Sequence, residues 1–478
     1  AQISTVDRAP IAGAFDFNFE TGEATATSAS KEVIEYSFGE GVQLSSEPTY
    51  IHAAVPAGEY DELYVTLYDV DGGVMYATVK ANNEKPLAVG KVREFSSNIP
   101  YAATDQVFVV KDVATLKEFA AQAATLEKDV LFVADVDMSG EAWTPIEGYA
   151  KTVRGNGYAI KGMTAPLFGV TSASIKGLHL KDVNISVNGL LHVGALAGTI
   201  TATDTISPIV EHCSVSGTIN VNNETLTIPE GAAETRVNVG GLVGVAYGVA
   251  FESCCNSANI TITKPLADAH ALEFTQSFGG IVGRVQVFTK SDATTITSYV
   301  NKSTNSGNLT FGHSTAAVPY LYMGGILGLS TEDNISGYVS NSINTGKLSA
   351  NNTIYSLYLA GIIGYARCVT NKADLMPVFE NNINRGEIEV KEETVITSLV
   401  NVAGIGGRTN SCAHRNSHNY GTINLLKGSV ASGTIDIAGV VAYVIYGSTS
   451  SGYKISFNVE DCSNNAPINV GLGRPGTT

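Results

Sequence analysis

Two glutamates stand where they could act together as a catalytic pair. Glu211 and Glu252 occupy the same position in consecutive copies of a repeated segment, so stacked copies would bring their carboxylates onto neighbouring coils. Neighbouring strands lie about 4.8 Å apart, close to the carboxylate spacing of a retaining glycosidase. No Lys or Arg accompanies the pair at this position in the adjoining copies, as a polysaccharide lyase would need. The simpler interpretation is a solvated outer column, and we assign no catalytic residue.

A second set of residues could bind a ligand without reacting with it. Each member precedes a copy of a glycine motif, and the set comprises Tyr322, Tyr358, Asn401 and Asp436. The apolar neighbours of the two tyrosines predict that the rings point away from the core, because side chains alternate along a strand. Aromatic faces beside amide and carboxylate groups are typical of a sugar-binding strip. The alternative is that both are ordinary surface tyrosines.

Metal and cofactor sites are not predicted. Cys412, His414 and His418 are residue types that bind zinc, but no fourth ligand follows in register. The sequence contains no phosphate-binding loop of the Gly-x-x-x-x-Gly-Lys-Ser/Thr type and no Gly-x-Ser-x-Gly nucleophile turn. We therefore expect no cofactor.

The positions of these residues depend on a repeat. Seven copies of a Gly-Gly-Ile-Val-Gly-like motif begin at 194, 240, 279, 324, 360, 403 and 438, an average period of about 41 residues. A second motif follows each copy and is aligned on Gly217, Ala258, Gly307, Gly346, Gly386, Gly421 and Ala466. Two residues before that position, six of the seven copies have Asn: Asn256, Asn305, Asn344, Asn384, Asn419 and Asn464.

These columns predict stacked coils. A recurring Asn indicates a ladder of amides that bond from coil to coil, and the following Gly suits a bend with positive φ. An Ile/Leu column and a column of small residues, which includes Cys213, Cys254 and Cys462, predict the core. The fold class is therefore all-β, with a parallel β-helix over 104–478. By analogy with known β-helices we expect it to be right-handed and three-sided.

The segments before the repeats have other patterns. Thr115 and Glu118 have the spacing of a capping box, and the residues that follow predict an amphipathic helix over 115–126 that covers the open end of the β-helix. Residues 1–103 lack the repeat, and their alternating strands predict a separate β-sandwich.

Composition excludes several functional classes. The chain has 478 residues and a net charge of −16, without a basic run, so it is a poor nucleic-acid binder. The sequence has no apolar stretch of about 18 residues, so it predicts no transmembrane helix. The low Lys content and the start at Ala1 lead us to expect an exported protein whose targeting segment lies upstream.

The glycine copies, such as Gly240-Gly-Leu-Val-Gly244, resemble the GLUG motif of Bacteroidetes surface proteins. Residues 1–103 are similar to fimbrillin-like domains, through Val55-Pro-Ala-Gly58 and the strand at Tyr64. The resemblance implies an extracellular lipoprotein on the bacterial outer surface, with a lipid anchor upstream of this chain. It implies no catalytic residues.

The leading hypothesis is a non-enzymatic cell-surface adhesin that recognises glycans or host glycoproteins. Its contacts would come from the outer tyrosine strip or from the loops at 220–238, 264–276 and 284–298. One alternative is a polysaccharide-active hydrolase or lyase that uses Glu211 and Glu252. The other is a structural or assembly component of the cell surface, which would pair with another subunit by strand addition.

Overall fold

The computed structural model describes most of the chain. The described residues are 1–6, 10–17, 24–42, 49–58, 60, 62–69, 73–80, 87–88, 107–223, 226, 236–264, 275–312, 318–331, 337–367, 377–392, 394–425, 429–430, 433–445 and 458–471. The predicted loops at 220–238 and 264–276 lie largely outside these residues. The segment 284–298 is described and contains a small antiparallel hairpin of β26 (Phe288–Thr289) and β27 (Thr295–Ile296).

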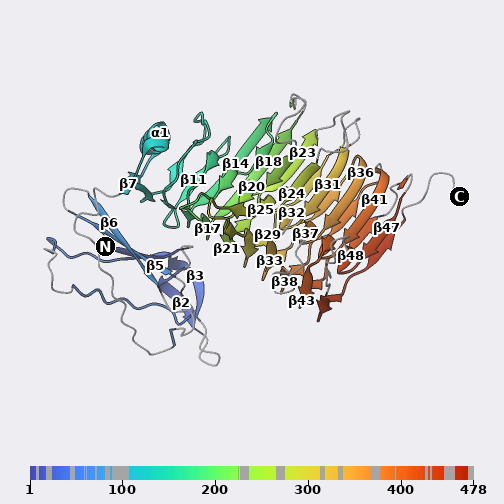
Figure 1. Ribbon diagram of the computed structural model, residues 1–478. Helices are drawn as coiled ribbons and strands as arrows, with labels where there is room; N and C mark the ends of the chain where they lie inside the picture. Colours follow the sequence, from blue (N-terminus) through green and yellow to red (C-terminus); the bar gives the residue numbers. More distant parts are fainter. Residues whose placement is uncertain are drawn as a thin grey trace.

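Most described residues belong to a parallel β-helix (Figure 1). Each full coil contributes strands to four parallel sheets, which we call I, II, III and IV in chain order. Sheet I contains β7 (Val107–Val110), β8 (Asp129–Phe132), β10 (Val153–Arg154), β13 (Ile175–Lys176), β17 (Ile209–Glu211), β21 (Ala250–Glu252), β28 (Tyr299–Asn301), β33 (Tyr338–Ser340), β38 (Val378–Glu380), β43 (Ala413–Arg415) and β49 (Asn458–Glu460). The expectation of three sides is therefore corrected to four sheets.

Sheet II is the largest sheet, because two short strands of most coils join it. Its strands are β9 (Val136–Asp137), β11 (Ala159–Lys161), β14 (His179–Asn188), β18 (Ser214–Asn222), β22 (Cys255–Asn256), β23 (Asn259–Lys264), β29 (Thr304–Asn305), β30 (Leu309–Phe311), β34 (Ile343–Asn344), β35 (Leu348–Ala350), β39 (Ile383–Asn384), β40 (Ile388–Val390), β44 (His418–Asn419), β45 (Ile423–Leu425), β50 (Ser463–Asn464) and β51 (Ile468–Val470).

Sheets III and IV lie on either side of the glycine motif. Sheet III contains β15 (His192–Val193), β19 (Val237–Gly240), β24 (Thr275–Gly279), β31 (Val318–Gly324), β36 (Thr353–Ala360), β41 (Val395–Ala403), β46 (Ser429–Val430) and β47 (Ile435–Ala438). Sheet IV contains β12 (Phe168–Thr171), β16 (Ala197–Thr201), β20 (Val243–Tyr247), β25 (Val282–Gln286), β32 (Leu327–Thr331), β37 (Ile363–Arg367), β42 (Gly406–Asn410) and β48 (Val441–Ile445).

The register of the strands confirms the repeat alignment. Gly279 pairs with Gly324 in sheet III, and the Asn column pairs in order from Asn256 to Asn464 in sheet II. Six members of the predicted Ile/Leu column, from Ile219 to Ile423, are buried in one continuous core with Cys213 and Cys254 of the small-residue column. In the last coil Ile468 is exposed and Cys462 is half-buried. The thiols of Cys213 and Cys254 are free. The repeats are therefore the coils themselves.

The predicted amide ladder is present, and it is buried from Asn256 to Asn419. Asn305 Nδ2 donates to Asn344 Oδ1 at 2.7 Å, and Asn344 Nδ2 donates to Asn384 Oδ1 at 2.8 Å. The positive φ predicted for the following Gly is confirmed at Gly217, where φ is 113°, but it is wrong for later copies such as Gly346. A Cβ at Gly346 would instead lie 2.0 Å from the carbonyl oxygen of Gly307 on the preceding coil. Close approach of the backbones, not bend geometry, requires glycine here.

The positive φ angles occur five residues before that Gly. This column has φ between 43° and 56° in all seven copies and comprises His212, Ser253, Lys302, Asn341, Asn381, Asn416 and Asp461. Asn341, Asn381 and Asn416 form a second, exposed ladder with 2.8 Å bonds between their side chains. Asn tolerates left-handed backbone better than most residues, so the bend selects it.

The capping helix is present, with corrected bounds. Helix α1 spans Val113–Gln122 and begins two residues before the predicted start. The N-cap is Asp112, which forms the capping box with Thr115, so Thr115 is the third helical residue and not the cap. Leu116 and Phe119 pack into the core. Figure 1 shows α1 at the end of the β-helix. A carboxylate cap at Asp112 outcompetes the Thr115 hydroxyl for that role.

Antiparallel strands precede the β-helix. A four-stranded sheet has the order β4 (Val33–Glu35), β1 (Gln2–Thr5), β5 (Glu62–Tyr68) and β6 (Val74–Lys80), and β2 (Ala12–Phe17) pairs with β3 (Ala24–Lys31). A β-sandwich over 1–103 stays a prediction. The sheet lies against the first coils (Figure 1), where Asn156 Nδ2 donates to Thr66 Oγ1 at 3.2 Å.

Candidate functional site

The four predicted binding residues come together in one column of sheet III. Tyr322 pairs with Tyr358, Tyr358 with Asn401, and Asn401 with Asp436 on successive coils. Their neighbours Leu321 and Met323 lie in the main core, so the column faces the outer side of the sheet, as alternation predicts. Asn401 Nδ2 donates to Asp436 Oδ2 at 2.9 Å.

The expectation that the two tyrosines form a free strip is wrong. Tyr322 is 9% exposed and Tyr358 is 3% exposed, and they form a separate buried cluster with Leu329. Asn401 is also buried. The cluster exists because the outer faces of sheets III and IV turn toward each other. We call this region the outer seam, formed by Tyr322, Tyr358, Asn401 and Asp436 of sheet III and Leu329, Tyr365, Arg408 and Tyr443 of sheet IV.

The glycine motif allows the two sheets to close the seam. Gly364 ends the copy that begins at Ala360, and it lies in sheet IV. A Cβ at Gly364 would lie 2.5 Å from the backbone nitrogen of Met323 in sheet III and 2.7 Å from the carbonyl oxygen of Gly328. Only a residue without a Cβ lets the strands approach so closely, and the outward side chains of both sheets then meet.

Aromatic stacking fills the seam. The rings of Tyr322 and Tyr358 are stacked with centroids 4.9 Å apart, and Tyr365 lies 5.2 Å from Tyr322 and 5.6 Å from Tyr358. Burial raises the pKa of Tyr322 and of Tyr365, while the guanidinium of Arg408 opposes the effect at Tyr365. The phenols of Tyr322 and Tyr365 are therefore neutral at physiological pH and present hydroxyl groups as donors and acceptors.

Arg408 is the residue of the seam that sequence reasoning missed. Its guanidinium carbon lies 5.4 Å from the Tyr365 ring centroid and 5.2 Å from that of Tyr443, and Nη1 donates to the Tyr358 hydroxyl at 3.2 Å. Arg408 is half-buried, and Tyr443 is 37% exposed. The signal was available, because Tyr365, Arg408 and Tyr443 each follow directly after a glycine motif copy.

The seam thus has a closed part and an accessible part. Tyr322 and Tyr358 form its buried base, which supports the rings above them. Tyr365 and Arg408 are half-buried, and Tyr355 and Tyr443 are exposed. Tyr320 connects the two parts, since its ring stacks on Tyr322 and meets Tyr355 edge-on at 5.7 Å. Flat aromatic edges with a guanidinium suit a polar ligand that also has apolar faces.

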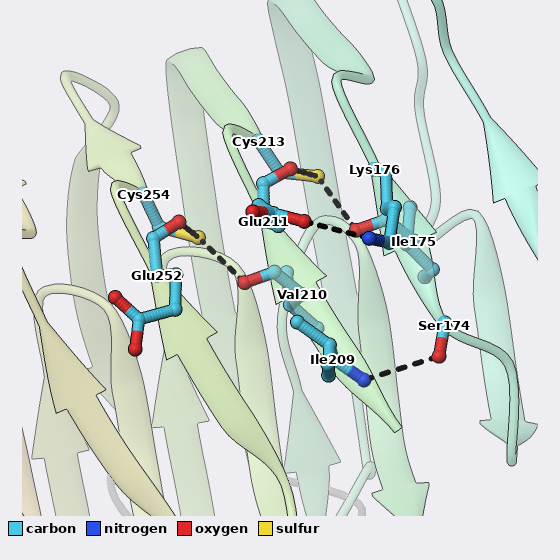
Figure 2. Close-up of polar contacts among 9 residues, drawn as sticks. All are labelled: Ser174, Ile175, Lys176, Ile209, Val210, Glu211, Cys213, Glu252 and Cys254. Carbon is cyan, nitrogen blue, oxygen red and sulfur yellow. Dashed lines mark hydrogen bonds and ion pairs between the residues drawn. The ribbon is translucent and has the colours of Figure 1, made fainter. Parts of the chain in front are cut away.

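The glutamate pair has a different environment (Figure 2). Glu211 and Glu252 pair in register on sheet I, as the repeat predicts. The prediction that no cation accompanies them is wrong, because Lys176 pairs with Glu211 on the preceding coil and its Nζ lies 2.8 Å from Glu211 Oε2. Glu252 points away from that ion pair and accepts a 2.8 Å bond from Asn301 Nδ2. Each carboxylate already has a structural partner, so the arrangement does not favour a catalytic pair.

The three residues considered as zinc ligands, Cys412, His414 and His418, do not form a metal centre in the described part of the chain. Within the described residues, no three His, Cys, Asp or Glu side chains lie close enough to hold a metal ion. Cys412 and His414 are fully buried in the β-helix, and His418 bonds to Ser463 and Asn416 on its outer side. The described part of the chain also has no helix long and apolar enough to cross a membrane.

Comparisons with known proteins identify no family. No protein-family model matches the chain, and no curated protein matches it. Among solved structures, one similar chain is the "putative immunoglobulin A1 protease" from Bacteroides ovatus, with 13% sequence identity and a TM-score of 0.35. The match covers 76% of this chain and 77% of that one.

Proposed function

We propose that this protein is a non-enzymatic binding protein of the bacterial cell surface that recognises glycans through the outer seam. The observation that carries the proposal is the contact of Arg408 with the rings of Tyr365 and Tyr443 at the accessible part of the seam. Sugars present C–H faces to aromatic rings and hydroxyls to charged and amide groups, and the seam supplies both. The β-helix is the rigid support, since its ladders hold each ring in register.

The cellular setting belongs to the same proposal. The glycine copies support a surface protein of the GLUG-repeat type, and the pattern of residues 1–103 supports a fimbrillin-like domain before it. A lipid anchor upstream of Ala1 would then hold the β-helix outside the cell. The ligand would be a polysaccharide or the glycan of a host glycoprotein.

The test is retention of the purified chain on immobilised mucins and polysaccharides. We expect specific retention. Tyr365→Ala with Tyr443→Ala should weaken it at least about tenfold, since an aromatic ring stacked on a ligand ring contributes about 1 kcal/mol or more. The matched control is Tyr299→Ala with Tyr338→Ala, which removes a stacked pair 5.2 Å apart on sheet I. Equal losses in both double variants, or no retention of the parent chain, would contradict the proposal.

A further inference from the structure

The charge of the outer seam differs from that of the whole chain. The protein has a net charge of −16, yet the accessible part of the seam presents Arg408 and, two residues further along the preceding strand of sheet IV, Arg367. Arg367 is exposed, and Asn410, its partner in register, donates to the Tyr365 hydroxyl at 3.3 Å. Tyr365 thus contacts the guanidinium of Arg408 and stands two residues before Arg367 on its own strand.

These cations are not neutralised within the described residues. None of the ion pairs formed there includes Arg367 or Arg408. The carboxylate of the seam, Asp436, instead accepts the amide of Asn401. Arg408 Nε is buried and has no acceptor in the described part of the chain. Among the described residues, the contacts of this half-buried guanidinium are with rings and a hydroxyl, so it keeps most of its capacity to bind an anion.

We propose that the ligand of the outer seam is an acidic glycan, with Arg408 binding a sugar carboxylate while Tyr365 and Tyr443 pack against the sugar ring. The inference rests on the proposed function and narrows it to one ligand class. The planar guanidinium of Arg donates two parallel hydrogen bonds to a carboxylate. A neutral sugar has no carboxylate and cannot accept this pair of charge-assisted bonds. Arg367 adds a second positive charge at the same edge of sheet IV.

The net charge of the protein disfavours acidic polymers in general. The overall negative charge repels them at long range, so nonspecific attraction cannot explain their retention. Binding of an acidic glycan would have to come from a local positive site. Arg408 in the seam and Arg367 beside it together outnumber Asp436, the carboxylate of the seam.

The experiment compares acidic glycans with neutral partners of the same backbone. The probes are polygalacturonate and its methyl ester, hyaluronan and its carboxyl-reduced form, and sialylated mucin and its desialylated form. We expect at least one acidic form to be retained and its neutral partner to bind at least about tenfold more weakly, the loss typical of a charge-assisted hydrogen bond. Dextran sulfate beside dextran tests whether sulfate replaces the carboxylate.

The variants locate the site. Arg408→Gln should weaken the acidic glycan about 10- to 100-fold, and Arg408→Lys should restore only part of the loss because the fork is absent. Arg385→Gln is the matched control, since Arg385 lies 5.0 Å over the Tyr420 ring at another face. Arg367→Gln covers the case in which Arg408→Gln fails to fold, because Arg367 is exposed and should cost binding without lowering Tm.

The outcomes separate this inference from the proposed function. If neutral glycans are retained as strongly as their acidic partners, the proposal of an acidic ligand is overturned. The proposal of a glycan-binding protein would then still stand. Acidic retention unchanged in both Arg variants, or retention of dextran sulfate alone, would also overturn the proposal of an acidic ligand. Retention of no glycan at all would contradict both proposals.

Discussion

The amide of Asn344 packs directly against the backbone of Gly325, which lies on the other side of the β-helix interior. A Cβ at Gly325 would lie 2.4 Å from Asn344 Cγ and 2.1 Å from the carbonyl oxygen of Gly361. The two sequence motifs, one rich in Gly and one with Asn, are thus halves of a single packing unit. The same contact recurs between Gly280 and Asn305 and between Gly361 and Asn384.

We expect Gly325→Ala to lower the stability of the β-helix strongly. The added methyl group has no space, because a backbone carbonyl and a bonded amide cannot move independently, and overpacking of this kind costs about 1–3 kcal/mol or more. The measurement is Tm by circular dichroism. Gly58→Ala is the control, since a Cβ there meets nothing within 4 Å. An unchanged Tm for Gly325→Ala would show that the coils separate easily.

The buried amide ladder should depend on both ends of each amide. In Asn344→Asp, the side chain still accepts from Asn305 but no longer donates to Asn384, and a carboxylate is buried without a cation. We expect a loss of several kcal/mol, larger than that of Asn344→Ala. Urea unfolding of both variants measures the difference.

The exposed ladder supplies the control for that comparison. Asn341→Gly preserves a backbone with φ of 50° and removes two solvent-exposed bonds, to Asn301 and from Asn381, so its stability should change by less than about 1 kcal/mol. An equal effect at Asn341 and Asn344 would mean that burial does not set the strength of the ladders.

His414 should make the β-helix sensitive to acid. It is fully buried and stacks on Phe379 with centroids 5.2 Å apart, and burial lowers its pKa to about 3. The unfolded chain protonates His near pH 6.5, so stability from this group is complete above that pH. As the pH falls from 6.5 to 3, each pH unit should lower the free energy of unfolding by up to about 1.4 kcal/mol. His414→Phe should flatten the dependence of Tm on pH over this window, and an unchanged slope would exclude His414 as its source.

The carboxylates of sheet I should not support catalysis. Glu252→Gln keeps an acceptor for Asn301 and should leave glycan retention unchanged and stability within about 0.5 kcal/mol. Incubation of the parent chain with the same polysaccharide panel should release no reducing ends and no unsaturated products. Release of either product that Glu252→Gln abolishes would instead establish the enzyme.

Much of the fold could be predicted from the sequence because each coil pairs with its neighbours in register. The Asn and Gly columns recur since their side chains contact the same column of the next coil, so one-dimensional spacing records the stacking directly. His414 lies beside Phe379 and Val459 for this reason. The start of α1 was misplaced by two residues, because Asp112 and Thr115 could each serve as the cap and only the folded backbone selects one.

The candidate site depended on contacts between columns, which the repeat does not encode. Alternation places Tyr322 and Tyr358 on the outer side of sheet III, but their burial follows from the approach of sheet IV, which brings Tyr365 and Arg408 over them. The ion pair of Lys176 with Glu211 could not be predicted, because the first coils are too irregular to align with the later copies. The sequence by itself determined which residues share a column, since stacking repeats them. Only the tertiary structure decided which columns face one another, because that depends on how closely glycine lets two sheets approach.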